Sequence, residues 1–329
     1  MNDTQKIVKL AVDHAQGSLG QFSADEAEHT LRAALNTLAG GKDGQFDAKA
    51  FRKNKLALFE VMEEVLDAIV DQGITNNFDA FVEIKNVKHG DKPVFMIEDN
   101  ALFNVATIAS GTNNLRRQRI DRTSLNVSTN YKGVKIYEEL ERFLAGRVDW
   151  AKLVNRVQQS FIAQIGKDIF GALKAGYQGL SAPYAYTGTF DLTQFNTLVS
   201  HVEAATNRQV MVAGTKLALQ KVTPAYVAYN GGAIDLRNKD GYFKIVDGVP
   251  LLEIKQAHDI NSTNFAIDNN FLLVIPSGEE KIVKMVVEGD SEIKEVTNEN
   301  ADESLEYVFK KKYGVGVITA NKYGVYNLS

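Results

Sequence analysis

Residues 149–176 carry the pattern of one long helix that is apolar on a single side. Asp149 is a typical helix-capping residue, and the apolar side chains after it recur at steps of three and four. At 1.5 Å per residue such a helix is roughly 40 Å long, enough to cross a whole domain. The stripe consists of Trp150, Leu153, Val154, Val157, Phe161, Ile165, Ile169 and Leu173. Because this stripe is narrow, it predicts a β-sheet on which the helix lies.

The C-terminal region supplies the strands for that sheet. Stretches with the strand pattern cover residues 281–288, 304–312, 314–320 and 322–328. Gly314 and Gly316 mark a place in this region where another backbone approaches closely. We therefore expect the long helix and these strands to be adjacent in space although they are far apart in sequence.

An extended, basic segment precedes the long helix. From Phe81 the sequence alternates with period two, and the turn at 89–93 predicts a hairpin that returns through residues 94–97. A second extended stretch, 103–108, leads into a run of four arginines with little apolar surface among them. These arginines are Arg116, Arg117, Arg119 and Arg122.

Such a cluster cannot lie in a core, and three interpretations of it stay open. The arginines contact a second subunit, since guanidinium groups pair well with carboxylates across interfaces. Alternatively they form an ordinary surface turn, or they contact nucleic-acid phosphates.

The rest of the chain divides into helices at the start and an α/β segment after the long helix. A capping box at Ser23 and Glu26 opens one helix, and a second helix spans roughly residues 48–72. The acidic side of that second helix is expected to face solvent: Glu60, Glu63, Glu64 and Asp67. Later signals are helices that begin at Asp191 and Thr215, strands at 209–213, 242–246, 251–254 and 271–275, and a turn at 247–250.

Recognised catalytic chemistry finds little support in this sequence. The chain has no cysteine, so thiolate nucleophiles and disulfides are excluded. No phosphate-binding loop, serine-hydrolase elbow or paired zinc motif occurs. The five histidines are scattered, and each is expected at the surface or on a helix face. We therefore predict no catalytic, cofactor-binding or metal-binding residue, and an enzyme with a dispersed site stays as an alternative.

Charge and hydropathy narrow the class further. A net charge of −4, from 37 basic and 41 acidic residues, argues against a dedicated nucleic-acid binder. The chain has no apolar run long enough to cross a bilayer and no secretory pattern at its start, so the default expectation is a cytoplasm.

The order of these parts resembles the major capsid proteins of tailed bacteriophages, whose fold is named after the phage Hong Kong ninety-seven and is shared with encapsulins. Residues 246–252 look like the Gly-x-Pro hairpin of that family's A-domain, and residues 321–328 look like its short final strand. The resemblance implies an α+β fold. Its parts would be an N-terminal helical arm (1–80), an extended β-hairpin E-loop (81–131), a P-domain with the long spine helix on a β-sheet (132–187 and 277–329) and an α/β A-domain (188–276).

The same resemblance implies a function. The chain would be a structural subunit of an icosahedral phage head, self-assembling into hexamers and pentamers that enclose double-stranded DNA. Its partners would be other copies of itself, portal and scaffolding proteins and, non-specifically, the packaged DNA, without a membrane or a cofactor. It would assemble in the host cytoplasm and reside in the virion capsid. An encapsulin-like shell around an enzyme cargo stays open as a further alternative.

Overall fold

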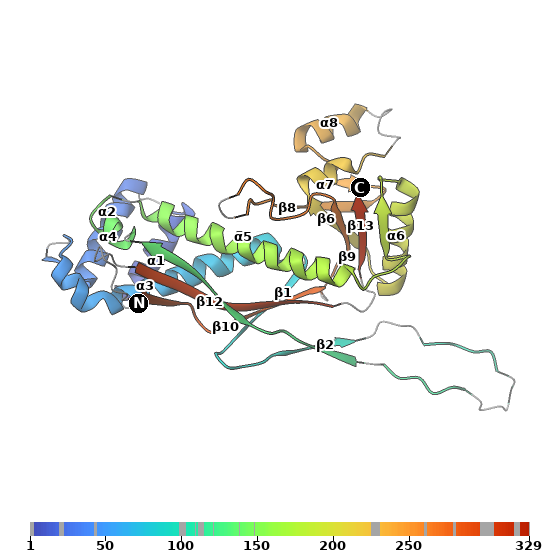
Figure 1. Ribbon diagram of the computed structural model, residues 1–329, viewed down its shortest axis with the longest axis horizontal. Helices are drawn as coiled ribbons and strands as arrows, with labels where there is room; N and C mark the ends of the chain where they lie inside the picture. The colour runs from blue at the N-terminus through green and yellow to red at the C-terminus, as the bar shows by residue number, and fades with distance from the viewer. Residues whose placement is uncertain are drawn as a thin grey trace.

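In the computed structural model the long helix α5 runs along the molecule, with helices and a sheet at one end and a second sheet at the other (Figure 1). A narrow arm reaches away from this body on the side opposite α5. The structure describes residues 3–19, 23–42, 45–98, 103–108, 110, 115–120, 122–137, 139–147, 149–224, 231–259, 262–278, 281–296, 306–318 and 323–328.

Helix α5 (Trp150–Tyr177) confirms the predicted long helix. Asp149 caps it, because its side chain accepts a hydrogen bond from the backbone N–H of Lys152 at 2.9 Å. The apolar stripe is buried over almost its whole length, from Trp150 to Leu173. The helix is therefore held by packing along one face rather than by its own propensity.

The sheet beneath α5 is built around one long strand. Strand β12 (Glu306–Val317) pairs antiparallel with β10 (Val283–Glu288), β11 (Glu292–Val296) and β4 (Asn130–Tyr137), and β1 (Val82–Val87) runs parallel to β10. The ring of Phe161 on α5 meets Phe309 edge-on at 5.2 Å. The predicted packing of the long helix on C-terminal strands is confirmed by this contact.

Helices α1 (Asp3–Gln16), α2 (Ala24–Leu38), α3 (Ala48–Phe78) and α4 (Glu139–Leu144) cover the same side of this sheet around the start of α5. The capping box between Ser23 and Glu26 forms as expected. The indole Nε1 of Trp150 donates to the carbonyl oxygen of Ala11 at 3.2 Å, which ties α1 to α5. This end of the molecule is one continuous apolar core.

One expectation about polar residues at this core is wrong in part. Glu60 and Glu64 are exposed as expected, whereas Glu63 and Asp67 of α3 are half-buried and accept hydrogen bonds from the backbone N–H groups of Ile293 (2.5 Å) and Ser291 (2.9 Å). His14 lies on a buried face of α1, and its Nε2 lies 3.1 Å from a carboxylate oxygen of Glu28. The acidic side of α3 thus provides hydrogen-bond acceptors for the backbone at residues 291–293.

Lys311 of β12 lies against the acidic side of α3. Its side chain is only 2% exposed, and its Nζ lies 2.7 Å from Asp67 and 2.6 Å from Asp71. A buried ammonium requires charged partners, because its transfer out of water is costly. The ion pairs therefore join α3 to β12 across the layer.

The second sheet forms the other end of the molecule. Its order is β5 (Ala185–Gly188), β13 (Gly324–Leu328), β9 (Phe271–Pro276), β6 (Val210–Thr215), β8 (Val249–Ile254) and β7 (Ile245–Val246). Helices α6 (Leu192–Thr206) and α7 (Lys216–Lys221) begin at the predicted caps Asp191 and Thr215, and α8 (Gly231–Asp240) projects from this end (Figure 1). The predicted turn places Asp247 and Gly248 at positive φ between β7 and β8. Strand β7 is shorter than the predicted 242–246.

The final strand was expected under α5 and instead belongs to the second sheet. Strand β13 pairs with β9 and β5, and Gly324 lies so close to α6 that a Cβ there would be 2.6 Å from Leu198. Period-two alternation identifies a strand and its two faces, but it does not identify the neighbouring strands.

The predicted hairpin of residues 81–97 is also wrong. Strand β1 pairs with β10, and β2 (Val94–Glu98) pairs with β3 (Arg122–Asn126) instead. Val82 of β1 is fully buried in the main core. Burial of β1 therefore draws it into the sheet, while the turn after it sends the chain out into the arm.

We expect Lys311→Met to lower the free energy of unfolding by about 1–3 kcal/mol, since the half-exposed carboxylates of Asp67 and Asp71 lose their charged hydrogen-bond donor. Urea denaturation measures this loss. The matched control is Lys294→Met, which removes an exposed ion pair with Glu292 and should cost less than about 1 kcal/mol. Equal losses in the two variants would contradict the buried role of Lys311.

Candidate functional site: the projecting arm and its root

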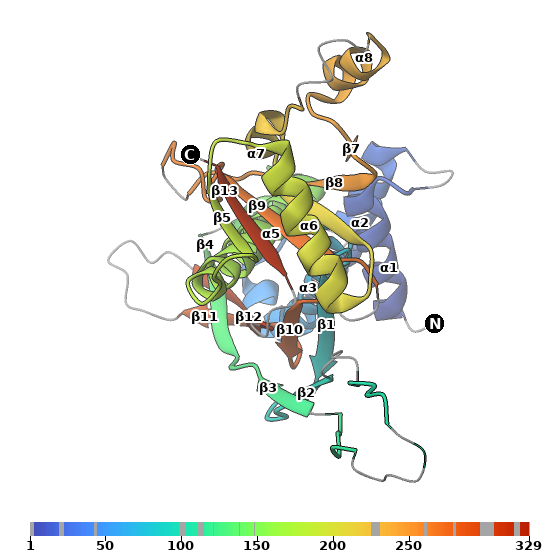
Figure 2. The same cartoon turned by 90° about the vertical axis from the view of Figure 1, so that its right-hand side faces the viewer.

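The most unusual surface of this chain is the arm, which we define as residues 94–126. Strands β2 and β3 form a two-stranded ribbon, and beyond it residues 103–108 and 115–120 continue as two extended legs outside any described strand. Figure 2 shows the arm extending away from both sheets. A two-stranded ribbon of this kind has no core of its own.

One side chain joins the two legs. The amide of Gln118 donates to the carbonyl oxygen of Asn104 at 2.9 Å and accepts from the Asn104 backbone N–H at 2.7 Å. The side-chain amide thus replaces one rung of a backbone ladder. The legs are held at a fixed separation without being paired as strands.

The legs expose apolar side chains to solvent. Val105 is 92% exposed, the highest value among the large apolar residues exposed in the described chain. The other exposed ones on the legs are Phe103, Ile108, Leu115 and Ile120. A cluster of this kind on a projecting segment indicates a surface that another macromolecule covers.

The four predicted arginines lie on this arm. Arg116, Arg117 and Arg119 are on the returning leg, and Arg122 begins β3. All four side chains are exposed, as expected for residues excluded from a core. The arm therefore presents cations and apolar side chains together, a composition found in protein interfaces.

At the root of the arm, three chain segments meet on Glu288 at the end of β10. Its carboxylate is 4% exposed and accepts hydrogen bonds from the Gly90 backbone N–H (2.9 Å), the Thr129 hydroxyl and the Lys312 ammonium (2.6 Å). The hydrogen bonds from Lys312, Thr129 and Gly90, in that order, lower the pKa of Glu288 from its ordinary 4.5 to about 2. The group is therefore ionised throughout the neutral range.

A small apolar cluster holds the same root. Phe95 of β2, Val127 and Val286 of β10 are buried together, apart from the two larger cores. The Nζ of Lys85 lies 4.2 Å from the centre of the Phe95 ring, a cation–π contact. Phe95 thus anchors the outgoing strand of the arm on the sheet.

The glycines of β12 let the returning strand cross close by. A Cβ on Gly314 would lie 2.1 Å from the carbonyl oxygen of Ser128, and one on Gly316 would lie 3.0 Å from a methyl of Val127. This confirms the predicted close backbone approach at Gly314 and Gly316. The crossing side of β12 has to be free of side chains at these two positions.

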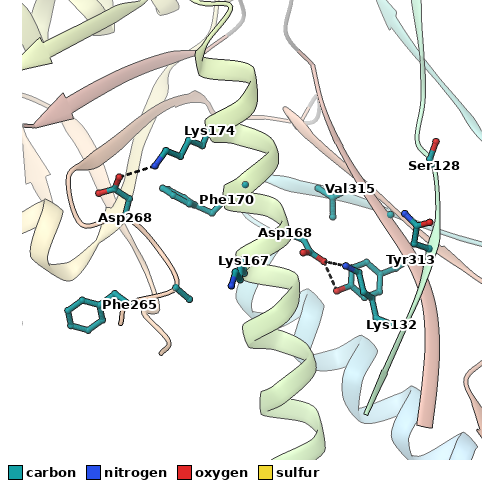
Figure 3. Close-up of a pocket in the computed structure, with 14 residues that line it drawn as sticks. Ser128, Lys132, Lys167, Asp168, Phe170, Lys174, Phe265, Asp268, Tyr313 and Val315 are labelled. Carbon is teal, nitrogen blue, oxygen red and sulfur yellow. Dashed lines mark hydrogen bonds and ion pairs between the residues drawn. The ribbon is translucent and has the colours of Figure 1, made fainter. Parts of the chain in front are cut away.

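A recess of about 750 Å³ lies between α5, β12 and the 265–268 loop, and the charges that line it are paired within the chain (Figure 3). Asp168 accepts from the Tyr313 hydroxyl at 2.9 Å and lies 3.4 Å from Lys132. Lys174 pairs with Asp268 at 3.3 Å. Burial and the Asp168 charge raise the pKa of Tyr313, so its hydroxyl stays a donor.

This recess has no described arrangement for catalysis. Ser128 is among its lining residues, but the described lining includes no histidine or cysteine beside it. In the described part of the chain, no cluster of three or more acidic or histidine side chains is placed to hold a metal. No helix within the same residues has the length and apolar character needed to cross a membrane.

Solved structures define the class of this fold. The head of Helicobacter pylori bacteriophage KHP40 is similar at 9% identity and a TM-score of 0.51, covering 75% of this chain and 86% of that one. The capsid of Helicobacter pylori bacteriophage KHP30 is similar at 9% identity and a TM-score of 0.50, covering 76% and 90%. The chain therefore has the fold of phage capsid proteins, as the sequence resemblance implied.

The family follows from the sequence itself. Residues 6–327 match the model of the family described as "SPbeta prophage-derived putative capsid protein YonB", and the chain belongs to this family. No curated protein matches the chain in sequence. Membership makes the protein a structural capsid component rather than an enzyme, which confirms the predicted class.

We expect Glu288 to stabilise the folded protein by an amount that decreases at acid pH. Because folding depresses its pKa to about 2, the contribution is complete above pH 4.5 and is lost as the pH falls through about 2. The difference in unfolding free energy between wild type and Glu288→Gln should therefore shrink over this window. Urea denaturation at stepped pH measures it, and a difference that does not change between pH 5 and pH 2 would contradict the low pKa.

Proposed function

We propose that this chain is the repeating subunit of an icosahedral phage head, in which hexamers and pentamers enclose double-stranded DNA. Membership in a capsid protein family and the phage capsid fold support this proposal. Rings of subunits require heterologous contacts, in which one surface of a copy meets a different surface of the next copy. The arm is well suited to make such a contact.

The composition of the arm supports the proposal of a contact between subunits. Its legs expose five large apolar side chains and lie outside any described strand. In a monomer, legs with this apolar exposure would promote unspecific association. A neighbouring copy that covers the legs would prevent this association and would add to the buried interface.

Arg116, Arg117, Arg119 and Arg122 would supply the specificity of this contact. Guanidinium groups form bidentate pairs with carboxylates, so they fix register as well as attraction between neighbours. Contact with a neighbouring subunit is favoured over contact with DNA phosphates because the same legs carry apolar side chains, which phosphates do not bind.

The finer organisation follows as part of this proposal. Residues 1–80 would be the N-terminal arm, 81–131 the E-loop, 132–187 with 277–323 the P-domain, and 188–276 with β13 the A-domain at the capsomer centre. Portal and scaffolding proteins would bind the shell, the packaged DNA would contact it non-specifically, and assembly would take place in the host cytoplasm before the protein resides in the virion capsid.

Charge reversal of the four arginines to glutamate tests the arm contact. Wild-type protein should form shells or rings in assembly-promoting salt, and the reversed variant should give roughly tenfold fewer particles, because like charges would then face each other. Negative-stain electron microscopy and sedimentation measure the yield, and circular dichroism checks the fold. The matched control replaces the same residues with lysine, which keeps the charge. Unchanged yield in the glutamate variant would refute the contact.

A further inference from the structure

The arm leaves and re-enters the body at one carboxylate. Gly90 lies in the turn through which the chain leaves β1, and Thr129 lies where it returns to β4. Both donate to Glu288, although they are 198 and 159 residues away from it in sequence. Lys312 of β12 completes the set from the central strand. One side chain thus ties both ends of the arm to the sheet.

The carboxylate of Glu288 uses both of its oxygens. Oε1 accepts from the Gly90 N–H and the Lys312 ammonium, while Oε2 accepts from the Thr129 hydroxyl. A glutamine could retain these contacts, because its NH₂ group could donate to the Thr129 hydroxyl, whereas an alanine removes all three at once. Because the Glu288 side chain is only 4% exposed, its partners are protein groups rather than open solvent.

The other root contacts lie next to the Glu288 ties in the chain. Phe95 is buried against the sheet, and the backbone at Ser128 passes over Gly314 without room for a Cβ. These contacts hold β2 and the returning strand on the sheet. Gly90 precedes Phe95 and Thr129 follows Ser128, so Glu288 binds the two segments that lead into and out of these contacts.

We propose that Glu288 is a positioning residue for assembly, which fixes the direction of the arm before it meets a neighbouring copy. The inference rests on the proposed function, since it concerns how the arm of a shell subunit is presented. A fixed direction removes the ordering cost that a swinging arm would incur on binding. Loss of Glu288 would leave the arm folded at its root and free in its angle.

Spin-label distances test the direction of the arm in the unassembled subunit. The chain has no cysteine, so Val105→Cys on the arm and Ser160→Cys on α5 give two unique labelling sites. Wild type should give one narrow distance distribution, and Glu288→Ala a distribution at least twofold broader. Glu292→Ala, on the neighbouring strand β11 with its carboxylate half exposed, is the matched control and should match wild type.

A second variant separates direction from folding. Thr129→Val removes one tie to the arm and keeps the ion pair between Glu288 and Lys312, so the fold should be retained. We expect a smaller broadening than for Glu288→Ala. This variant keeps the proposal testable if Glu288→Ala fails to fold.

Particle yield of the unlabelled variants completes the test. Glu288→Ala should lower the yield of shells on the order of tenfold, Thr129→Val less, and Glu292→Ala not at all. Narrow distances in both arm variants, or broad distances with unchanged yield, would overturn the positioning role. If wild type itself forms no particles, the proposed function fails, whereas the distances still show whether Glu288 directs the arm.

Discussion

Strand β12 is the element on which both sides of this molecule depend, because its alternate residues serve two different partners. Phe309, Lys311 and Tyr313 face the helices, where they pack on α5 or pair with α3. Lys312, Gly314 and Gly316 face the arm, where they meet Glu288 and the returning strand. A register slip of one residue would exchange these two sets and destroy both contacts.

This shared strand couples the arm to the body. The arm root has its own small core and a buried carboxylate, while the legs beyond it expose apolar and cationic side chains. The chain thus combines a fixed attachment with an exposed outer segment. That combination is what a shell subunit needs, since a contact between copies requires both a defined direction and an uncovered surface.

The sequence predicted the elements well and their neighbours less well. Asp149 and the apolar spacing after it located α5, and Gly314 and Gly316 located the close crossing, because both signals are local. The partners of β1 and β13 were wrong, since alternation defines the faces of a strand but leaves its pairing open.

Within the candidate site, the exposed arginines were predictable from their density in sequence, whereas the root was not. The ties of Glu288 to Gly90 and Thr129 span more than 150 residues, and no local pattern reports such distances. One signal was present: residues 283–288 form a buried strand that ends in a carboxylate, and a buried carboxylate requires donors. The burial of Lys311 gave no comparable signal, since lysines surround it in sequence.

The arm contact between subunits is tested most directly by a cryo-electron microscopy map of the assembled particle at a resolution that shows side chains. We expect residues 103–108 and 115–120 to lie against a neighbouring copy, with arginines of the arm at carboxylates of that neighbour. An arm that projects into solvent in the assembled particle, or folds back on its own body, would contradict it.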